Sequence, residues 1–253
     1  MRQKIAIVVI ATNAYFTLGV RLINRFHHFN KADDIEFHFF ADVDPAEYLP
    51  DDVSYQYYPA SHSDWVAGVN SKFLNILSLQ DSQSDYLYYI DADTGIHEHF
   101  SMEPFFGSLM GSVHFMDQGF ESAADFPFDR YPESACFVPL DSPLPNIYYH
   151  GAIFGGRKEK VMNFCRKMLL LQEKNQKIIH EPVWNDESHL NYYFHYNPPD
   201  NIFPFANFPF VISCKGGIEN TRNPDLDLEH QKEGIRKNKN RLIDIRDGNV
   251  VFD

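Results

Sequence analysis

Two aspartates, Asp91 and Asp93, stand one residue apart directly after the apolar run from Tyr86 to Ile90. Two carboxylates at a strand end can hold a divalent cation through oxygen ligands and leave positions open for phosphate oxygens. A pair of solvated turn residues would show the same spacing. Phosphatases that form an aspartyl phosphate also carry D-x-D after an apolar strand, but Thr94-Gly95 reverses the Gly-Thr order expected there. The pair favours a metal site at a phosphate, with turn aspartates as the alternative.

A second group of polar residues lies between Trp184 and Asn191, in the segment WNDESHLN. Its density of carboxylate, hydroxyl and imidazole groups indicates a site. If the segment enters a helix, an N-cap role for Asp186 and a first-turn role for Glu187 would explain the same residues structurally. For His189 alone we expect a hydrogen-bonded structural role rather than that of a ligand.

A third segment, YYHGAIFGG from Tyr148 to Gly156, changes abruptly from aromatic to small residues. Small side chains let a ligand approach the backbone closely. The same pattern predicts a strand that ends in a Gly155-Gly156 turn before a helix starting near Lys158. We expect both interpretations to hold.

The hydrophobic pattern indicates the elements that position these segments. The nearly continuous apolar run over 4–12 predicts a strand buried on both faces of a parallel sheet. Helical spacing follows over 18–26, and a second strand over 35–40. Another helix around 73–77 precedes the strand over 86–90. The order predicts an α/β fold, and such sheets bind ligands outside the carboxyl ends of their strands.

The remainder of the chain is less regular. Five prolines between residues 115 and 147 predict long loops that flank a site. A helix starting near Lys158 has an apolar face, and residues 220–240 are charged and poor in apolar groups, which is typical of a surface arm.

Composition limits the class of protein. The 253 residues, with 44% hydrophobic and 23% charged, are enough for one large ordered domain or two small ones. A net charge of -13 disfavours nucleic acid and anionic membrane surfaces as partners. No apolar run reaches the roughly 18 residues of a transmembrane segment. The three cysteines, Cys136, Cys165 and Cys214, support neither a zinc knuckle nor a disulfide framework, so we expect a soluble cytoplasmic protein.

In order and spacing, the three segments together resemble glycosyltransferase family 6, the retaining enzymes of the histo-blood-group A and B and α-1,3-galactosyltransferase type. Weaker likeness extends over most of the chain up to Pro224. The resemblance implies a GT-A fold with a mixed, mostly parallel sheet flanked by helices. It implies one catalytic domain over 1–224 and a charged C-terminal arm over 225–253.

The resemblance also implies an activity: transfer of galactose or N-acetylgalactosamine from a UDP-sugar to a 3-hydroxyl of an acceptor galactoside, with retention and with Mn²⁺. Asp91 and Asp93 would hold the metal, and Glu187 would be the catalytic carboxylate facing the anomeric carbon and the acceptor. Trp184 would offer an apolar platform to an oligosaccharide acceptor, for which a fucosylated galactoside is one candidate. The implied donor-binding residues are Ile10, Ala11, Thr12, Tyr15, Lys72, His150, Gly151, Ala152, Asp186, Lys215 and Arg222.

The chain departs from the vertebrate members at several positions. Asn185 stands where they carry histidine, and Lys72 replaces an arginine. The N-terminal anchor of the Golgi enzymes is absent, so a soluble microbial or viral member is expected. His150-Gly151-Ala152 is similar to the galactosyltransferase pattern, and the methyl group of Ala152 narrows the space for an acetamido group, which favours galactose.

Two other functions remain as alternatives: a catalytically inactive relative that binds sugar or nucleotide, and a D-x-D phosphohydrolase. A binding module has no need to keep Asp91, Asp93 and Glu187 together. A phosphohydrolase does not account for the segment from Trp184 to Asn191.

Overall fold

The computed structural model describes residues 2–63, 65–96, 98–114, 120, 122–203 and 210–211. Within these ranges the fold is built on a seven-stranded sheet in the order β3-β2-β1-β4-β7-β6-β8. The strands are β1 (Lys4–Ile10), β2 (Asp34–Ala41), β3 (Tyr55–Pro59), β4 (Tyr86–Ile90), β6 (Leu109–Val113), β7 (Tyr149–Arg157) and β8 (Asn201–Phe203). The helices are α1 (Phe16–Phe29), α2 (Trp65–Leu77), α3 (Lys158–Lys177) and α4 (Asn185–Tyr196).

Strand order places a switch point between β1 and β4. β1 pairs in parallel with β2 on one side and with β4 on the other, while β2 continues in parallel to β3. β7 runs antiparallel between β4 and β6, and β8 is parallel to β6. The expected mixed, mostly parallel sheet is therefore confirmed. Because the chain passes from β1 to β2 and β3 on one side and then returns to β4 on the other, a crevice is expected outside the carboxyl ends of β1 and β4.

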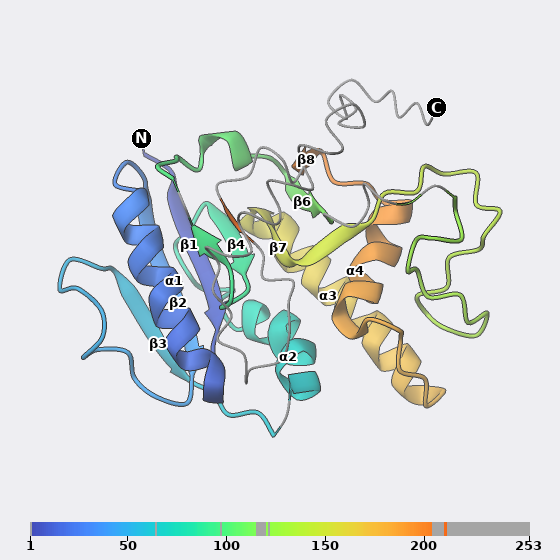
Figure 1. Ribbon diagram of the computed structural model, residues 1–253, viewed down its shortest axis with the longest axis horizontal. Helices are drawn as coiled ribbons and strands as arrows, with labels where there is room; N and C mark the ends of the chain where they lie inside the picture. The colour runs from blue at the N-terminus through green and yellow to red at the C-terminus, as the bar shows by residue number, and fades with distance from the viewer. Residues whose placement is uncertain are drawn as a thin grey trace.

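The sheet buries a separate hydrophobic core on each face. Along β1 the odd residues Ile5 and Ile7 pack with α1, whereas the even residues Ala6 and Val8 pack with α2, α3 and α4. This alternation is the period-two pattern of a strand covered on both faces. Figure 1 shows α1 beside β1 and β2, and the three other helices grouped together.

Short elements complete the fold. Two 3-10 turns, η1 (Asn13–Tyr15) and η2 (Glu103–Phe105), follow β1 and precede β6 respectively. A second, two-stranded sheet pairs β5 (Gly95–Ile96) with β9 (Phe210–Val211). η1 lies directly after β1, at the edge of the sheet where the crevice opens.

Most elements expected from the sequence are present, although their ends differ. The first strand stops at Ile10, and the predicted helix start at Lys158 and the strand over 86–90 match the structure. The predicted Gly155-Gly156 turn is wrong, because both glycines lie inside β7. A Cβ at Gly155 would lie 2.2 Å from a ring carbon of Tyr88, and Gly156 has a φ of +139°. The glycines let β7 fit between its neighbours.

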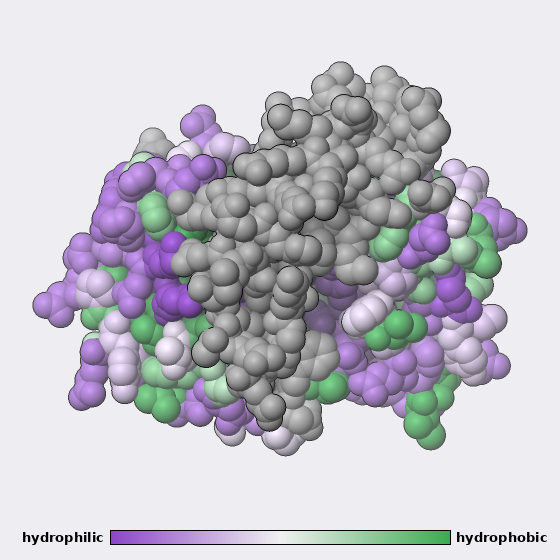
Figure 2. Space-filling model, viewed as in Figure 1, coloured by the Kyte–Doolittle hydropathy of each residue, from purple (hydrophilic) through white to green (hydrophobic). Residues whose placement is uncertain are grey.

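Residues 122–148, the main described part of the segment between β6 and β7, contain no helix or strand and form the expected loop, visible at the right of Figure 1. Its described part packs a small apolar cluster of Phe126, Phe128 and Val138 against Tyr148. Figure 2 shows the face of the molecule that is seen in Figure 1. On its described surface the hydrophobic residues form separated groups among hydrophilic ones. None of the described helices combines the length and the hydropathy of a bilayer-spanning segment. The predicted boundary at residue 224 lies outside the described residues.

Candidate active site

A cavity of about 500 Å³ opens at the carboxyl ends of β1 and β4, where β7 and α4 begin. It brings together residues from every segment singled out in the sequence. Those of the predicted site residues that line it are Ile10, Thr12, Tyr15, Lys72, Asp91, Asp93, His150, Gly151, Ala152, Trp184, Asp186 and Glu187. Also lining it are Asn13, Ala14, Gly68, Val69, Tyr89, Ala92 and His114.

The two aspartates lie in a turn anchored to the sheet. The backbone N–H of Asp91 donates to the carbonyl oxygen of Ala152 at 2.9 Å, which holds the turn against β7. The hydroxyl of Tyr89 donates to Oδ1 of Asp91 at 2.5 Å. Asp93, half-buried, also lines the cavity. Two carboxylates at an open cavity are oxygen donors of the kind that Mn²⁺ or Mg²⁺ accepts, so the residues fit a divalent cation.

Lys72, from α2, is a buried cation at the floor of the site, with 2% of its side chain exposed. Its Nζ lies 2.6 Å from Oδ2 of Asp186 and 3.8 Å from Oδ1 of Asp91. It also donates to the carbonyl oxygen of Gly151 at 3.1 Å and lies 4.5 Å from the ring centre of Tyr89. The lysine thus links α2, β4, β7 and α4 at one point.

The ionisation of this group follows from its partners. Burial by itself would lower the pKa of Lys72, but the carboxylates of Asp186 and Asp91 outweigh burial and raise it. Burial raises the pKa of Asp186 above its ordinary value, and Lys72 opposes that rise. A buried charge is stable only when it is paired, so the ammonium and the Asp186 carboxylate depend on each other.

Glu187 lies in the first turn of α4 with 18% of its side chain exposed. Burial raises its pKa to about 7, and the backbone N–H of Gly151, donating to Oε2 at 2.7 Å, opposes the rise. Gly151 makes this approach feasible, because a Cβ there would lie 3.2 Å from Oε2 of Glu187 and 3.3 Å from Oδ2 of Asp186. The small residues of the third segment therefore admit two carboxylates beside β7.

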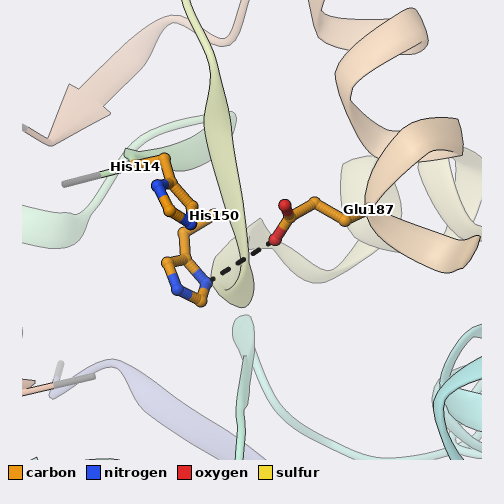
Figure 3. A group of neighbouring side chains, drawn as sticks. All are labelled: His114, His150 and Glu187. Carbon is orange, nitrogen blue, oxygen red and sulfur yellow. Dashed lines mark ion pairs between the residues drawn. The ribbon is translucent and has the colours of Figure 1, made fainter. Parts of the chain in front are cut away.

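Two stacked imidazoles stand next to Glu187 (Figure 3). The rings of His114 and His150 lie 4.5 Å apart between centres and 9° from parallel. Burial lowers the pKa of His150 to about 3 and that of His114 to about 2. Both rings are therefore neutral at pH 7, and Nδ1 of His150 accepts the backbone N–H of Ala152 at 3.0 Å. His114 was not among the residues expected from the sequence. Its one signal was its place directly after Leu109–Val113, a short stretch of apolar and small residues.

The ligand atoms of His114, His150 and Glu187 lie within 4.8 Å of one another. Imidazole lone pairs lie in the ring plane, so two nearly parallel stacked rings do not direct them to one point. Nδ1 of His150 is also committed to a backbone N–H. The two aspartates therefore fit a cation better than this trio does.

The start of α4 differs from the expected capping pattern. The N-cap residue is Trp184, not Asp186, whose side chain instead pairs with Lys72. The hydroxyl of Ser188 accepts the backbone N–H of Trp184 at 3.0 Å, and Trp184 is 52% exposed. His189 has the expected structural role, because its Nδ1 hydrogen-bonds the carbonyl oxygen of Asn185 at 2.8 Å.

The remaining predicted residues divide into two groups. Ala11 is fully buried behind the wall of the cavity. Its backbone N–H donates to the carbonyl oxygen of Phe40, and its Cβ faces Gly19 of α1. The structure therefore does not bring the Ala11 side chain to the cavity. Lys215 and Arg222 lie outside the described residues.

The crevice between β1 and β4, with its aspartate pair and mixed sheet, defines an α/β fold of the GT-A type. Residues 70–206, more than half of the chain, match the family model of glycosyltransferase family 6. The chain belongs to this family, which confirms the resemblance.

Individual relatives are similar over part of their length. Histo-blood group ABO system transferase 2 of Rattus norvegicus is 32% identical over 120 residues, covering 47% of this chain and 34% of that protein. Globoside alpha-1,3-N-acetylgalactosaminyltransferase 1 of Gallus gallus is 30% identical over 133 residues, covering 51% of this chain and 36% of that protein. O-antigen biosynthesis glycosyltransferase WbnI of Escherichia coli is 27% identical over 145 residues, covering 55% of this chain and 58% of that protein. The match spans about a third of the two vertebrate relatives.

Proposed function

We propose that this chain transfers galactose or N-acetylgalactosamine from a UDP-sugar to a 3-hydroxyl of an acceptor galactoside, with retention of configuration. The observation that carries the proposal is the meeting of three groups in one cavity: the Asp91–Asp93 pair, the Lys72–Asp186 pair and the partly buried Glu187. Family membership and the names of the relatives support a glycosyltransferase.

The donor's diphosphate is proposed to lie beside the two aspartates, which would hold Mn²⁺. When bound, the cation supplies charge neutralisation to the departing UDP. Tyr89 and Lys72 orient Asp91 from behind, through a hydroxyl hydrogen bond and an ammonium at 3.8 Å. The turn that carries the two aspartates is thereby ordered before a ligand binds. This reduces the entropy cost of ordering the turn on binding.

The hexose is proposed to lie between Asp186 and Glu187. Lys72 keeps the Asp186 carboxylate ionised, so that it can accept hydrogen bonds from sugar hydroxyls. The Glu187 carboxylate acts on the anomeric carbon, as nucleophile or as stabiliser of an oxocarbenium-like transition state. The Gly151 N–H fixes one oxygen of this carboxylate, which restricts its orientation at the reacting carbon.

Two residues are proposed to determine which donor sugar and which acceptor bind. The Ala152 methyl group, at the cavity wall, restricts the space beside the sugar's C2 substituent, which favours galactose over N-acetylgalactosamine. Exposed Trp184 offers an apolar face to the acceptor, an oligosaccharide for which fucosylated and plain galactosides are the candidates.

The test offers UDP-galactose and UDP-N-acetylgalactosamine with Mn²⁺ and records UDP release with and without a panel of galactosides. We expect release from at least one donor, stimulated by an acceptor and by the metal. The matched control is Glu187→Gln, which keeps the shape and the Gly151 hydrogen bond but should lower turnover far more than UDP affinity. Tight UDP binding without any release would instead favour the inactive binding protein.

A further inference from the structure

A relay of hydrogen bonds runs from α3 to the first turn of α4 through two buried side chains. Nδ2 of Asn175, near the end of α3, lies 3.3 Å from Nε2 of His189. Nδ1 of His189 lies 2.8 Å from the carbonyl oxygen of Asn185, the residue directly before Asp186 and Glu187. Neither Asn175 nor His189 is among the described residues that line the cavity, so the relay reaches the site through the backbone of α4.

The direction of each hydrogen bond in the relay follows from its donors and acceptors. The carbonyl oxygen of Asn185 can only accept, so Nδ1 of His189 carries the proton and Nε2 of the neutral ring is an acceptor. Oδ1 of Asn175 accepts the backbone N–H of Ala135 at 2.6 Å, which leaves Nδ2 to donate to Nε2. Burial lowers the pKa of His189 to about 4, so the ring is neutral at pH 7. Asn175 therefore stabilises the tautomer of His189 that holds Asn185.

The backbone of Asn185 needs such support, because its φ of +44° lies in the left-handed region. A residue that carries a side chain keeps this conformation only where its surroundings hold it. The N–H of Asn185 donates to the carbonyl oxygen of Pro182 at 3.0 Å, and His189 holds the carbonyl oxygen of the same residue. Both ends of this strained residue are thus fixed by hydrogen bonds.

The conformation of Asn185 determines where the next two side chains begin. Asp186 leaves the turn toward Lys72, with 2.6 Å between Oδ2 and Nζ. Glu187 leaves it toward β7, where its Oε2 accepts the Gly151 N–H at 2.7 Å. Any rotation of the turn would displace both carboxylates.

We infer that Asn175 and His189 are positioning residues, which hold the first turn of α4 so that the Glu187 carboxylate faces the reacting sugar. This inference rests on the proposed function, in which Glu187 acts on the anomeric carbon. Rates depend steeply on such alignment, since a misplacement of about 1 Å can cost roughly 100-fold. The diphosphate, proposed to lie beside Asp91 and Asp93, should bind independently of the relay.

The experiment uses a matched pair of substitutions at His189. His189→Asn places an amide N–H at the position of Nδ1 and can donate to Asn185, but it is too short to reach Asn175. His189→Gln reaches Asn175 but leaves no donor at the position of Nδ1. In the UDP-release assay we expect kcat within about threefold of the wild type for His189→Asn and a loss of roughly 10- to 100-fold for His189→Gln. The dissociation constant of UDP with Mn²⁺, measured by calorimetry, should stay within about twofold in both.

The order of the two variants distinguishes positioning from a merely structural role. Glutamine is closer to histidine in size than asparagine is, so a role in filling space predicts that His189→Gln is the milder change. Calorimetry also gives the fraction of chains that bind UDP. Because kcat is expressed per binding chain, partial misfolding does not imitate the expected loss.

Asn175→Ala tests the first link of the relay. With His189 present it removes the donor to Nε2 and should lower kcat by roughly 3- to 10-fold, the effect of one neutral hydrogen bond. Added to His189→Asn it should change kcat by less than about twofold, because that link is already broken. Equal losses in both backgrounds would show that Asn175 does not act through His189.

The outcomes separate this inference from the proposed function. Absence of UDP release by the wild-type chain would refute the proposed function and this inference with it. Release by the wild type, with His189→Gln as active as His189→Asn, would refute the inference alone.

Discussion

Glu187→Gln should change how the stability of this protein depends on pH. In the folded chain burial raises the pKa of Glu187 to about 7, against an ordinary value of 4.5. Between these two values the folded state binds more protons than the unfolded state, so the free energy of unfolding must fall as the pH rises. The full difference corresponds to about 3 kcal/mol.

Proton linkage over an accessible range gives the size of the effect. From pH 5 to pH 8 the wild-type chain should lose about 2–3 kcal/mol through Glu187 alone. Glutamine does not titrate, has nearly the same volume and can still accept the Gly151 N–H. The variant should therefore gain stability relative to the wild type as the pH rises, and the gain should level off above pH 7.

Urea unfolding at pH 5, 6, 7 and 8 measures this difference. Titratable groups remote from Glu187 contribute equally to both chains and cancel in the comparison. Glu173→Gln is the matched control, because Glu173 is an exposed glutamate on α3 whose pKa is lowered by Lys177. Parallel stability curves for the wild type and Glu187→Gln would show that this carboxyl group is not desolvated as the structure implies.

Three further changes test other parts of the site and the fold. Lys72→Met should lower the free energy of unfolding by about 3–5 kcal/mol, because it leaves Asp186 buried and unpaired, and adding Asp186→Asn should recover part of the loss in urea unfolding; an undiminished loss would contradict the pairing. Asp91→Asn with Asp93→Asn should abolish Mn²⁺-dependent UDP binding in calorimetry, while the free protein stays folded because Asp186 still pairs with Lys72. Retained binding would place the metal elsewhere. Gly155→Ala should destabilise by about 3 kcal/mol or more, because its Cβ would overlap a ring and a backbone oxygen of β4; a thermal melt like that of the wild type would refute this packing.

Several features of the site could be predicted from the sequence because they depend on neighbours along the chain. The run Tyr86–Ile90 is entirely buried, so the strand and the position of Asp91 after it follow from local hydrophobicity. The abrupt change to small residues at Gly151 indicated a close approach, which the structure fills with two carboxylates.

Other features required the packed molecule. The capping role considered for Asp186 was a sound local expectation, yet a buried ammonium from α2 attracts the side chain more strongly than the helix end does. The Gly155-Gly156 turn failed for a related reason: spacing shows where small residues occur but not which neighbouring strand requires them.

What the sequence by itself determined was the order of strands and helices, the family, and the three segments that carry polar groups. This information lies in short-range hydrophobic periodicity and in contiguous motifs, which can be recognised without knowing which distant residues they contact. Only the tertiary structure decided that Lys72 bridges Asp91 and Asp186 and that His114 stacks on His150. These contacts join separate elements, and they exist because strand order and helix packing bring the ends of those elements to one edge of the sheet.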